Sequence, residues 1–146
     1  MVSTDLPKVL ETEVSCYPGP WSHQTFADCL SAQTKGYRCY VLLLDEGVIG
    51  HAVLTLILDE AELLNFCLAP TQQGKGLAAG YLDSVLMAMA KHGANKLFLE
   101  VRQSNAPARQ LYTSAGMQEI GRRKNYYPLR DGREDAILMG MEWQSD

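Results

Sequence analysis

A short segment at residues 73–79, the glycine loop, constrains the fold more than any other part of this sequence. It contains two closely spaced glycines and follows an apolar stretch that ends near Leu68. After it, apolar side chains repeat with the spacing of one helical face, at Leu77, Tyr81, Leu82, Val85, Leu86 and Met89. We therefore expect a strand, a glycine turn and a helix that ends at Gly93. The free N–H groups and positive dipole end of such a helix favour an anion, and Lys75 adds positive charge.

The rest of the chain predicts a mixed α/β domain. Capping residues and apolar spacing predict helices over residues 6–16, after Asp5, and from Ser22 to Gly36. Three apolar stretches at 39–44, 48–58 and 62–68, separated by acidic turns, predict an antiparallel meander covered on both faces. A strand at 96–102, a helix from Asn105 to Gly116 and strands near 117–127 and 136–143 follow. We expect one domain over residues 1–146, with helices on both faces of a central, mostly antiparallel sheet.

Composition and cysteine spacing exclude several classes of protein. With 13 basic and 17 acidic residues the net charge is −4, which disfavours a dedicated nucleic-acid binder. No apolar run is long enough to span a bilayer, and the first residues lack the pattern of a signal peptide. The cysteines Cys16, Cys29, Cys39 and Cys67 form no CxxC pair and have no histidine at zinc-ligand spacing. We therefore expect a cytoplasmic protein with no membrane partner, no metal and four free, mostly buried thiols.

Two other phosphate-binding patterns fit the glycine loop less well. In a Walker loop a hydroxyl residue follows the lysine, whereas Gly76 follows Lys75 here. A Rossmann fingerprint could use Gly74, Gly76 and Ala79, but the expected meander before the loop is not the start of a βαβ unit. The loop alone does not distinguish an anion-binding site from a purely structural turn.

Longer segments resemble a known family. Gln73-x-x-Gly76-x-Ala78 is similar to the acetyl-CoA pyrophosphate motif of GNAT-type N-acetyltransferases. Residues 59–65, 99–105, 111–112, 125–128 and 131–136 resemble the bacterial ribosomal-protein-alanine N-acetyltransferase (RimI-type) family over nearly the whole chain, the last two segments most specifically. That family normally begins with a short strand, and only four residues precede Asp5 here. The first strand is therefore expected to be short or missing.

The resemblance implies the GNAT fold, acetyl-CoA as co-substrate and a set of binding residues. The backbone of Phe66, Cys67 and Leu68 would pair with the pantetheine arm, and an N–H there would polarise the thioester carbonyl. The pyrophosphate would lie on Gln73, Gly74, Lys75, Gly76, Leu77, Ala78 and Ala79. Asn105 would contact the cofactor arm, cap a helix, or do both. Because no base is visible near Cys67, we do not expect its thiol to act as a nucleophile.

Glu100 and Tyr112 are the expected catalytic residues. Glu100 lies in an apolar strand, where partial burial favours a general base; the alternatives are a solvent-facing residue or an ion-pair partner of Arg102. By resemblance Tyr112 would protonate the leaving thiolate, and its alternative is plain core packing.

The resemblance also implies that the acceptor peptide lies near Tyr126 and Tyr127. They end a basic and aromatic segment, residues 122–127, that could be a peptide-binding wall, a solvated strand edge or, least favoured by the acidic chain, an RNA contact. We interpret His23, His51 and His92 as structural or surface residues.

The resemblance implies an acetyl-CoA-dependent N-terminal acetyltransferase that modifies the alanine terminus of a small-subunit ribosomal protein by direct amine attack. An α-amino group titrates near ~7.7–8.0 and a lysine near ~10.4, so a modest base suffices for the former. The alternatives are a GNAT enzyme acting on lysine side chains or a small amine, and a catalytically silent acyl-CoA-binding module. The expected partner is a protein N-terminus, without nucleic acid; the oligomeric state stays open, with a monomer the simpler assumption.

Overall fold

The computed structural model describes residues 1–143, which form one six-stranded sheet with helices on both sides. The helices are α1 (Leu6–Cys16), α2 (His23–Ser31), α3 (Leu77–Lys91) and α4 (Ala106–Ser114). The strands are β1 (Tyr37–Leu44), β2 (Gly47–Ile57), β3 (Glu60–Leu68), β4 (Lys96–Arg102), β5 (Gln118–Leu129) and β6 (Gly132–Glu142). The sheet order is β1-β2-β3-β4-β6-β5, and every neighbouring pair is antiparallel except β3 and β4.

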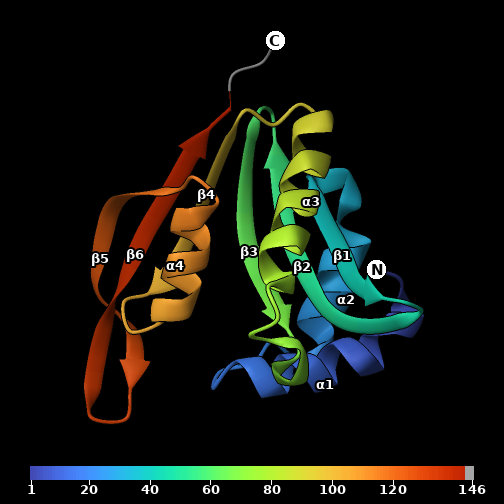
Figure 1. The fold of residues 1–146 in the computed structure, drawn as a ribbon, viewed down its shortest axis with the longest axis horizontal. Helices are drawn as coiled ribbons and strands as arrows, with labels where there is room; N and C mark the ends of the chain where they lie inside the picture. The colour runs from blue at the N-terminus through green and yellow to red at the C-terminus, as the bar shows by residue number, and fades with distance from the viewer. Residues whose placement is uncertain (144–146) are drawn as a thin grey trace.

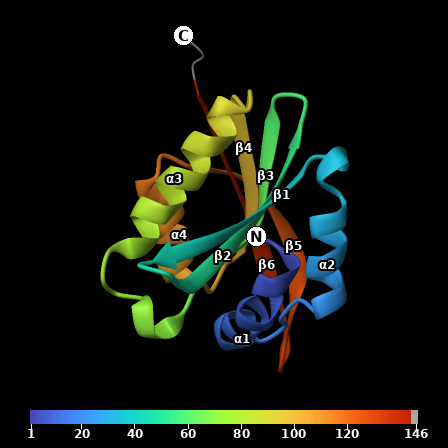
Figure 2. The same cartoon turned by 90° about the vertical axis from the view of Figure 1, so that its right-hand side faces the viewer.

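Two helices cover each face of the sheet. In Figure 2, α3 and α4 lie on one side of the sheet and α1 and α2 on the other. Neighbouring β2 residues Val53 and Leu54 are both fully buried but belong to different apolar clusters, Val53 to the α1/α2 side and Leu54 to the α3/α4 side. The expected meander with two covered faces is thus confirmed, because successive side chains of a strand point to opposite faces.

The ends of the first helices differ in detail from the prediction. The side chain of Asp5 does not cap α1; it accepts a hydrogen bond from the Val2 N–H at 2.8 Å and closes a 3-10 turn over Ser3–Asp5. The second helix ends at Ser31, well before Gly36, and a 3-10 turn over Gln33–Lys35 fills the interval. Within residues 1–143 no strand precedes α1, and the Met1 amino group instead donates to the Cys39 carbonyl on β1 at 3.1 Å.

The parallel strands β3 and β4 pair over only half their length. Pairing runs from Glu60 opposite Lys96 to Leu63 opposite Leu99, and both strands then continue apart. Figure 1 shows the two strands diverging toward α1 and α4. The carboxyl-terminal ends of both strands therefore have no strand partner on the side where they separate.

Within the described residues, no helix has both the length and the apolar character needed to cross a membrane.

Candidate active-site cleft

A cleft of about 870 Å³ opens where β3 and β4 separate. It collects residues from the end of α1, the end of β3, the glycine loop, β4, α4 and β5. The residues predicted from the sequence that line it are Phe66, Cys67, Leu68, Gln73, Gly74, Gly76, Leu77, Ala78, Ala79, Glu100, Asn105, Tyr112 and Tyr127. Lys75 and Tyr126 are not among its lining residues.

The glycine loop has the geometry of an anion cradle. Gly74 and Gly76 have φ values of 75° and 77°, which side-chain-bearing residues rarely adopt. A Cβ atom on either glycine would meet no other atom within 4 Å, so the backbone there is open to a ligand. Gly76 directly precedes α3, whose first N–H groups have no partner within the helix. These residues fit a pyrophosphate, whereas the Lys75 ammonium is turned to Gln72 Oε1 at 3.3 Å.

The diverging edge of β3 offers backbone groups for an added strand. The Phe66 carbonyl accepts a hydrogen bond from the Tyr17 hydroxyl at 2.5 Å, and the Leu68 carbonyl accepts one from Gln73 Nε2 at 2.8 Å. Side chains thus occupy the positions that a strand partner would take. Because N–H and C=O of one strand residue point the same way, the N–H groups of Phe66 and Leu68 face this side too.

Glu100 is partly buried, with 22% of its side chain exposed. Its Oε1 lies 2.8 Å from Arg123 Nε on β5. The alternative of a pair with Arg102 is wrong, because Arg102 instead contacts Glu134 at 3.1 Å. Burial, and then the charge of Glu100, raises the pKa of Glu62 on β3 above its ordinary value.

Tyr112 is buried on α4 and also lines the cleft. Burial, with smaller effects from Tyr17 and Tyr127, raises the pKa of its phenol above the ordinary value. The group therefore holds its proton at neutral pH, as a general acid must. Asn105, at the start of the same helix, accepts a hydrogen bond from the Ala108 N–H at 3.2 Å, so its expected capping role is confirmed.

The two tyrosines of β5 have different surroundings. Tyr127 lines the cleft, and the Arg102 guanidinium lies 4.5 Å from its ring centroid. Tyr126 is 45% exposed, and its ring centroid lies 5.0 Å from that of Tyr127. The basic segment 122–127 is a largely exposed strand edge in which Arg123 contacts Glu100.

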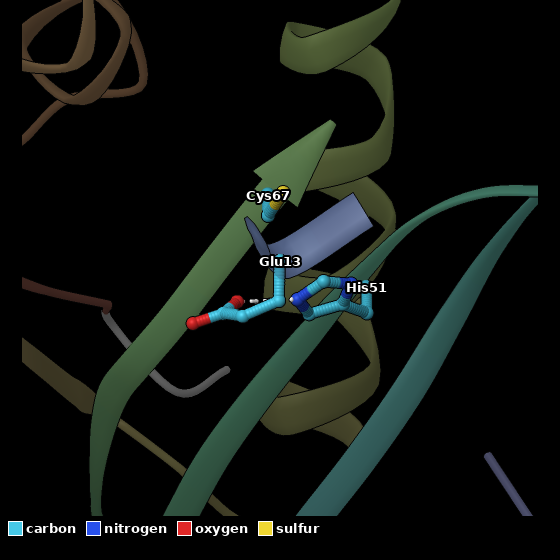
Figure 3. A group of neighbouring side chains, drawn as sticks. All are labelled: Glu13, His51 and Cys67. Atoms are coloured by element: carbon cyan, nitrogen blue, oxygen red, sulfur yellow. Dashed lines mark hydrogen bonds and ion pairs between the residues drawn. The ribbon is translucent and has the colours of Figure 1, made fainter. Parts of the chain in front are cut away.

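A buried polar cluster beside the cleft was not predicted (Figure 3). Glu13 on α1 accepts hydrogen bonds from His51 Nε2 at 2.9 Å, from Asn65 Nδ2 at 3.0 and 3.1 Å, and from the Trp21 N–H at 3.0 Å. Burial alone would raise the pKa of Glu13, but these contacts, led by His51, hold it below the usual value. The cluster joins α1, β2 and β3 to residues 17–21, which wall the cleft.

The sequence did contain a signal for this cluster. Glu13 follows Leu6 and Val9 on the buried face of α1, at the spacing of a core position. Ligand atoms of Glu13, His51 and Cys67 lie within 4.8 Å of one another. Both carboxylate oxygens of Glu13 already accept hydrogen bonds, so hydrogen bonding accounts for the cluster without a metal.

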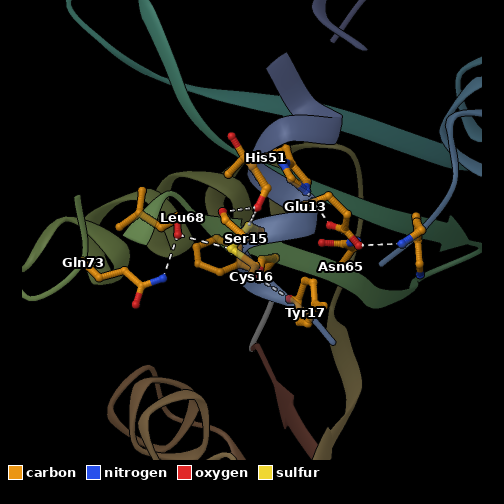
Figure 4. Close-up of a disulfide and its surroundings, with 12 residues drawn as sticks. Glu13, Ser15, Cys16, Tyr17, His51, Asn65, Leu68 and Gln73 are labelled. Atoms are coloured by element: carbon orange, nitrogen blue, oxygen red, sulfur yellow. Dashed lines mark hydrogen bonds and ion pairs between the residues drawn. A yellow bond between two sulfur atoms is a disulfide. The ribbon is translucent and has the colours of Figure 1, made fainter. Parts of the chain in front are cut away.

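The expectation of four free thiols is wrong. Cys16 and Cys67 form a disulfide between the last residue of α1 and the end of β3, with Cα atoms 6.2 Å apart (Figure 4). The two residues are 51 positions apart in sequence, so only the packing of α1 on β3 brings them together. Cys29 and Cys39 are free. The Cys67 sulfur is bonded in this state and offers no nucleophile.

Comparisons with known proteins agree with this geometry. Residues 6–117 match the Acetyltransferase (GNAT) family. The curated ribosomal protein bS18-alanine N-acetyltransferase of Escherichia coli strain K12 is 40% identical over 139 residues, covering 95% of this chain and 92% of the relative.

Solved structures give the same result. The crystal structure of the ribosomal-protein-S18-alanine N-acetyltransferase from Escherichia coli has a TM-score of 0.90 at 38% identity, covering all of this chain and 92% of that one. A GNAT family acetyltransferase from Elizabethkingia anophelis, solved with acetyl-CoA bound, shares the fold with a TM-score of 0.73 at 23% identity, over 90% and 88% of the two chains. The chain is an acetyltransferase that belongs to the GNAT family, in its ribosomal-protein-alanine N-acetyltransferase (RimI-type) branch.

Proposed function

We propose that this enzyme transfers the acetyl group of acetyl-CoA to the N-terminal α-amino group of a small-subunit ribosomal protein that begins with alanine. The observation that carries the proposal is the cleft itself, which brings the glycine loop, the unpaired edge of β3, Glu100 and Tyr112 together. The relative of known activity covers the same length of chain. Such a substrate assigns the reaction to the cytoplasm.

The donor would lie along β3 with its pyrophosphate on the glycine loop. The N–H groups of Gly76 and the first turn of α3 would bind the phosphates, and those of Phe66 and Leu68 would pair with the pantetheine arm. A backbone N–H on this edge would polarise the thioester carbonyl, a contact that typically contributes about 2.7–4 kcal/mol to an oxyanion transition state.

The acceptor would enter on the side of Glu100, Tyr127 and residues 17–21. Glu100, directly or through water, would take a proton from the α-amino group as its nitrogen attacks the carbonyl carbon. The C–S bond then breaks, and the Tyr112 hydroxyl donates its proton to the departing thiolate. Because Arg123 binds Oε1 of Glu100, the second carboxylate oxygen is the one available to the amine.

Steady-state acetyl-CoA turnover with three acceptor sets tests this function. One set begins with alanine and carries the following residues of a small-subunit ribosomal protein, one has a blocked N-terminus and an internal lysine, and one consists of polyamines. We expect kcat/KM to be highest for the alanine-starting peptides. Faster turnover of lysine peptides or polyamines would overturn the N-terminal assignment while leaving acetyl transfer in place.

A further inference from the structure

The Cys16–Cys67 disulfide lies inside the proposed donor cleft rather than on a distant surface. Both cysteines line it together with the edge of β3 and the glycine loop. The Cys16 side chain is half-buried, whereas Cys67 is 2% exposed. A thiol that enters the cleft therefore reaches the sulfur of Cys16 first.

Besides the hydrogen bonds between Glu13 and Asn65, two links join the end of α1 to β3, and the first is the disulfide. The second is the hydrogen bond from the Tyr17 hydroxyl to the Phe66 carbonyl, made by the residues next to the two cysteines. Tyr17 thus takes the place of a strand partner on the edge where a pantetheine arm would pair. The covalent link keeps Tyr17 close to that carbonyl, and without it a single hydrogen bond would have to compete with the incoming arm.

The two thiols of the reduced pair would also have hydrogen-bond acceptors. The Cys16 sulfur lies 3.4 Å from the Leu68 carbonyl, and the Cys67 sulfur lies 3.4 Å from the Thr12 carbonyl. After reduction each thiol can donate to the carbonyl that it already faces. Reduction therefore leaves neither thiol without a hydrogen-bond acceptor.

We propose that Cys16 and Cys67 form a redox-active site that controls donor binding. The disulfide holds Tyr17 on β3 and weakens acetyl-CoA binding. Reduction to two thiols frees Tyr17 and strengthens acetyl-CoA binding. Two thiols, R–SH, supply the electrons: the first attacks Cys16 Sγ and displaces the Cys67 thiolate, which takes up a proton. The second attacks the mixed disulfide, giving R–S–S–R and the Cys16 thiol. The proposal rests on the proposed function, because that function assigns the enzyme to the cytoplasm. Disulfides in the cytoplasm are mostly transient and either catalytic or redox-sensing.

The two free cysteines provide a matched control. Burial, and then the nearby Cys29, raises the pKa of Cys39 to about 11, and burial also raises the pKa of Cys29. Neither thiol is therefore much ionised at neutral pH, so neither competes for exchange with the pair. Cys39→Ser removes a cysteine that does not line the cleft, whereas Cys16→Ser prevents the disulfide with Cys67 from forming.

Acetyl-CoA binding to the full chain, measured by calorimetry after equilibration with reduced or oxidised dithiothreitol, tests the proposal. We expect the reduced protein to bind at least about fivefold more tightly. By linkage, saturating acetyl-CoA should then raise the midpoint potential of the pair by about 20 mV. Cys16→Ser should bind like the reduced protein under both conditions, Cys39→Ser should respond like the wild type, and oxidised Tyr17→Phe should bind nearly as well as reduced wild type.

Equal affinity in the two redox states, or a redox response that persists in Cys16→Ser, would overturn the proposal. Hydrogen exchange without ligand separates this result from failure of the proposed function. If neither state binds acetyl-CoA, the donor assignment fails, and with it the control of donor binding. Faster hydrogen exchange over residues 14–21 on reduction would then show that the disulfide still orders this wall of the cleft. Unchanged exchange would show that the disulfide does not order it either.

Discussion

Replacing Glu13 by glutamine tests the buried polar cluster most directly. The side chain of Glu13 is 1% exposed and that of His51 is fully buried, so neither can exchange a lost partner for water. His51 Nδ1 is buried without a partner in the described chain, so the hydrogen bond of Nε2 to Glu13 is the one that anchors the imidazole. Glu13 therefore accepts from His51, Asn65 and Trp21 through its two oxygens.

The size of the effect follows from this count of donors. A carboxamide keeps one accepting oxygen and places an NH2 group where the other oxygen was, facing the Asn65 amide together with either His51 or the Trp21 N–H. One or two buried donors then lose their acceptor, at about 1–3 kcal/mol each. We expect Glu13→Gln to lower the free energy of unfolding by about 3 kcal/mol, or the melting temperature by roughly 6–12 °C in a domain of this size.

Urea unfolding followed by tryptophan fluorescence, with the disulfide intact in every sample, measures this change. Glu11→Gln is the matched control, because the Glu11 side chain lies on the same helix but is 72% exposed and pairs with Lys8 at 3.4 Å. It should change stability by less than about 0.5 kcal/mol. A loss below about 1 kcal/mol for Glu13→Gln, or equal losses in the two variants, would refute the reasoning.

The pH dependence of stability is a second test of the Glu13 cluster, because the lowered pKa of Glu13 fixes the direction of the change. The folded pKa of Glu13 lies below its unfolded value of about 4.3, so its stabilising contribution is complete above that pH. The contribution is lost as the pH falls through the folded pKa. As the pH falls below about 4.3, the wild type should therefore lose more stability than Glu13→Gln. Parallel curves for the two proteins would contradict this.

Other variants separate the roles of the cleft residues. Tyr112→Phe should reduce kcat by about 10²–10⁴-fold with little change in acetyl-CoA affinity, and a loss confined to affinity would contradict its acid role. Glu100→Gln should lower kcat/KM by about 10²–10⁴-fold, and an unchanged kcat/KM would exclude it as the base. Gly76→Val should weaken acetyl-CoA binding in titration calorimetry, because a β-branched residue disfavours a φ of 77°; equal affinity would argue against the loop as the phosphate site. Reducing the Cys16–Cys67 disulfide, which closes a loop of about 50 residues, should lower the unfolding free energy by about 4 kcal/mol in urea, and a change below about 1 kcal/mol would show that α1 and β3 are held by packing alone.

Local sequence patterns predicted most of the elements of this fold. The bounds of α1 and β4 agree with the expected residues 6–16 and 96–102, since periodicity and capping are properties of neighbouring residues. The end of α2 was placed too late, because Gly36 ends a 3-10 turn that follows the helix and not the helix itself. Such errors do not move the cleft.

The missed features all depend on pairs of residues that are distant in sequence. The Cys16–Cys67 disulfide spans 51 positions, and Glu13 reaches His51 across 38. Cysteine spacing gives no information on which helix packs beside which strand, and a glutamate on the apolar face of α1 has no visible partner. Likewise the pairing of Glu100 with Arg123 follows from the place of β5 at the sheet edge, not from a local pattern.

The position of the cleft nevertheless follows from one topological fact. β3 and β4 are parallel, so the connection between them must cross the sheet through α3, and both strands end at the same edge. The glycine loop leaves β3 at that edge and opens α3 there, and Glu100 lies near the same end of β4. An anion site and a carboxylate are thus brought together by strand direction alone. The early end of β3–β4 pairing, at Leu63 and Leu99, then opens the space between them. A substitution that extended this pairing toward Phe66 would close the cleft and occupy the backbone groups that we assign to the pantetheine arm, although Glu100 and Tyr112 would be unchanged.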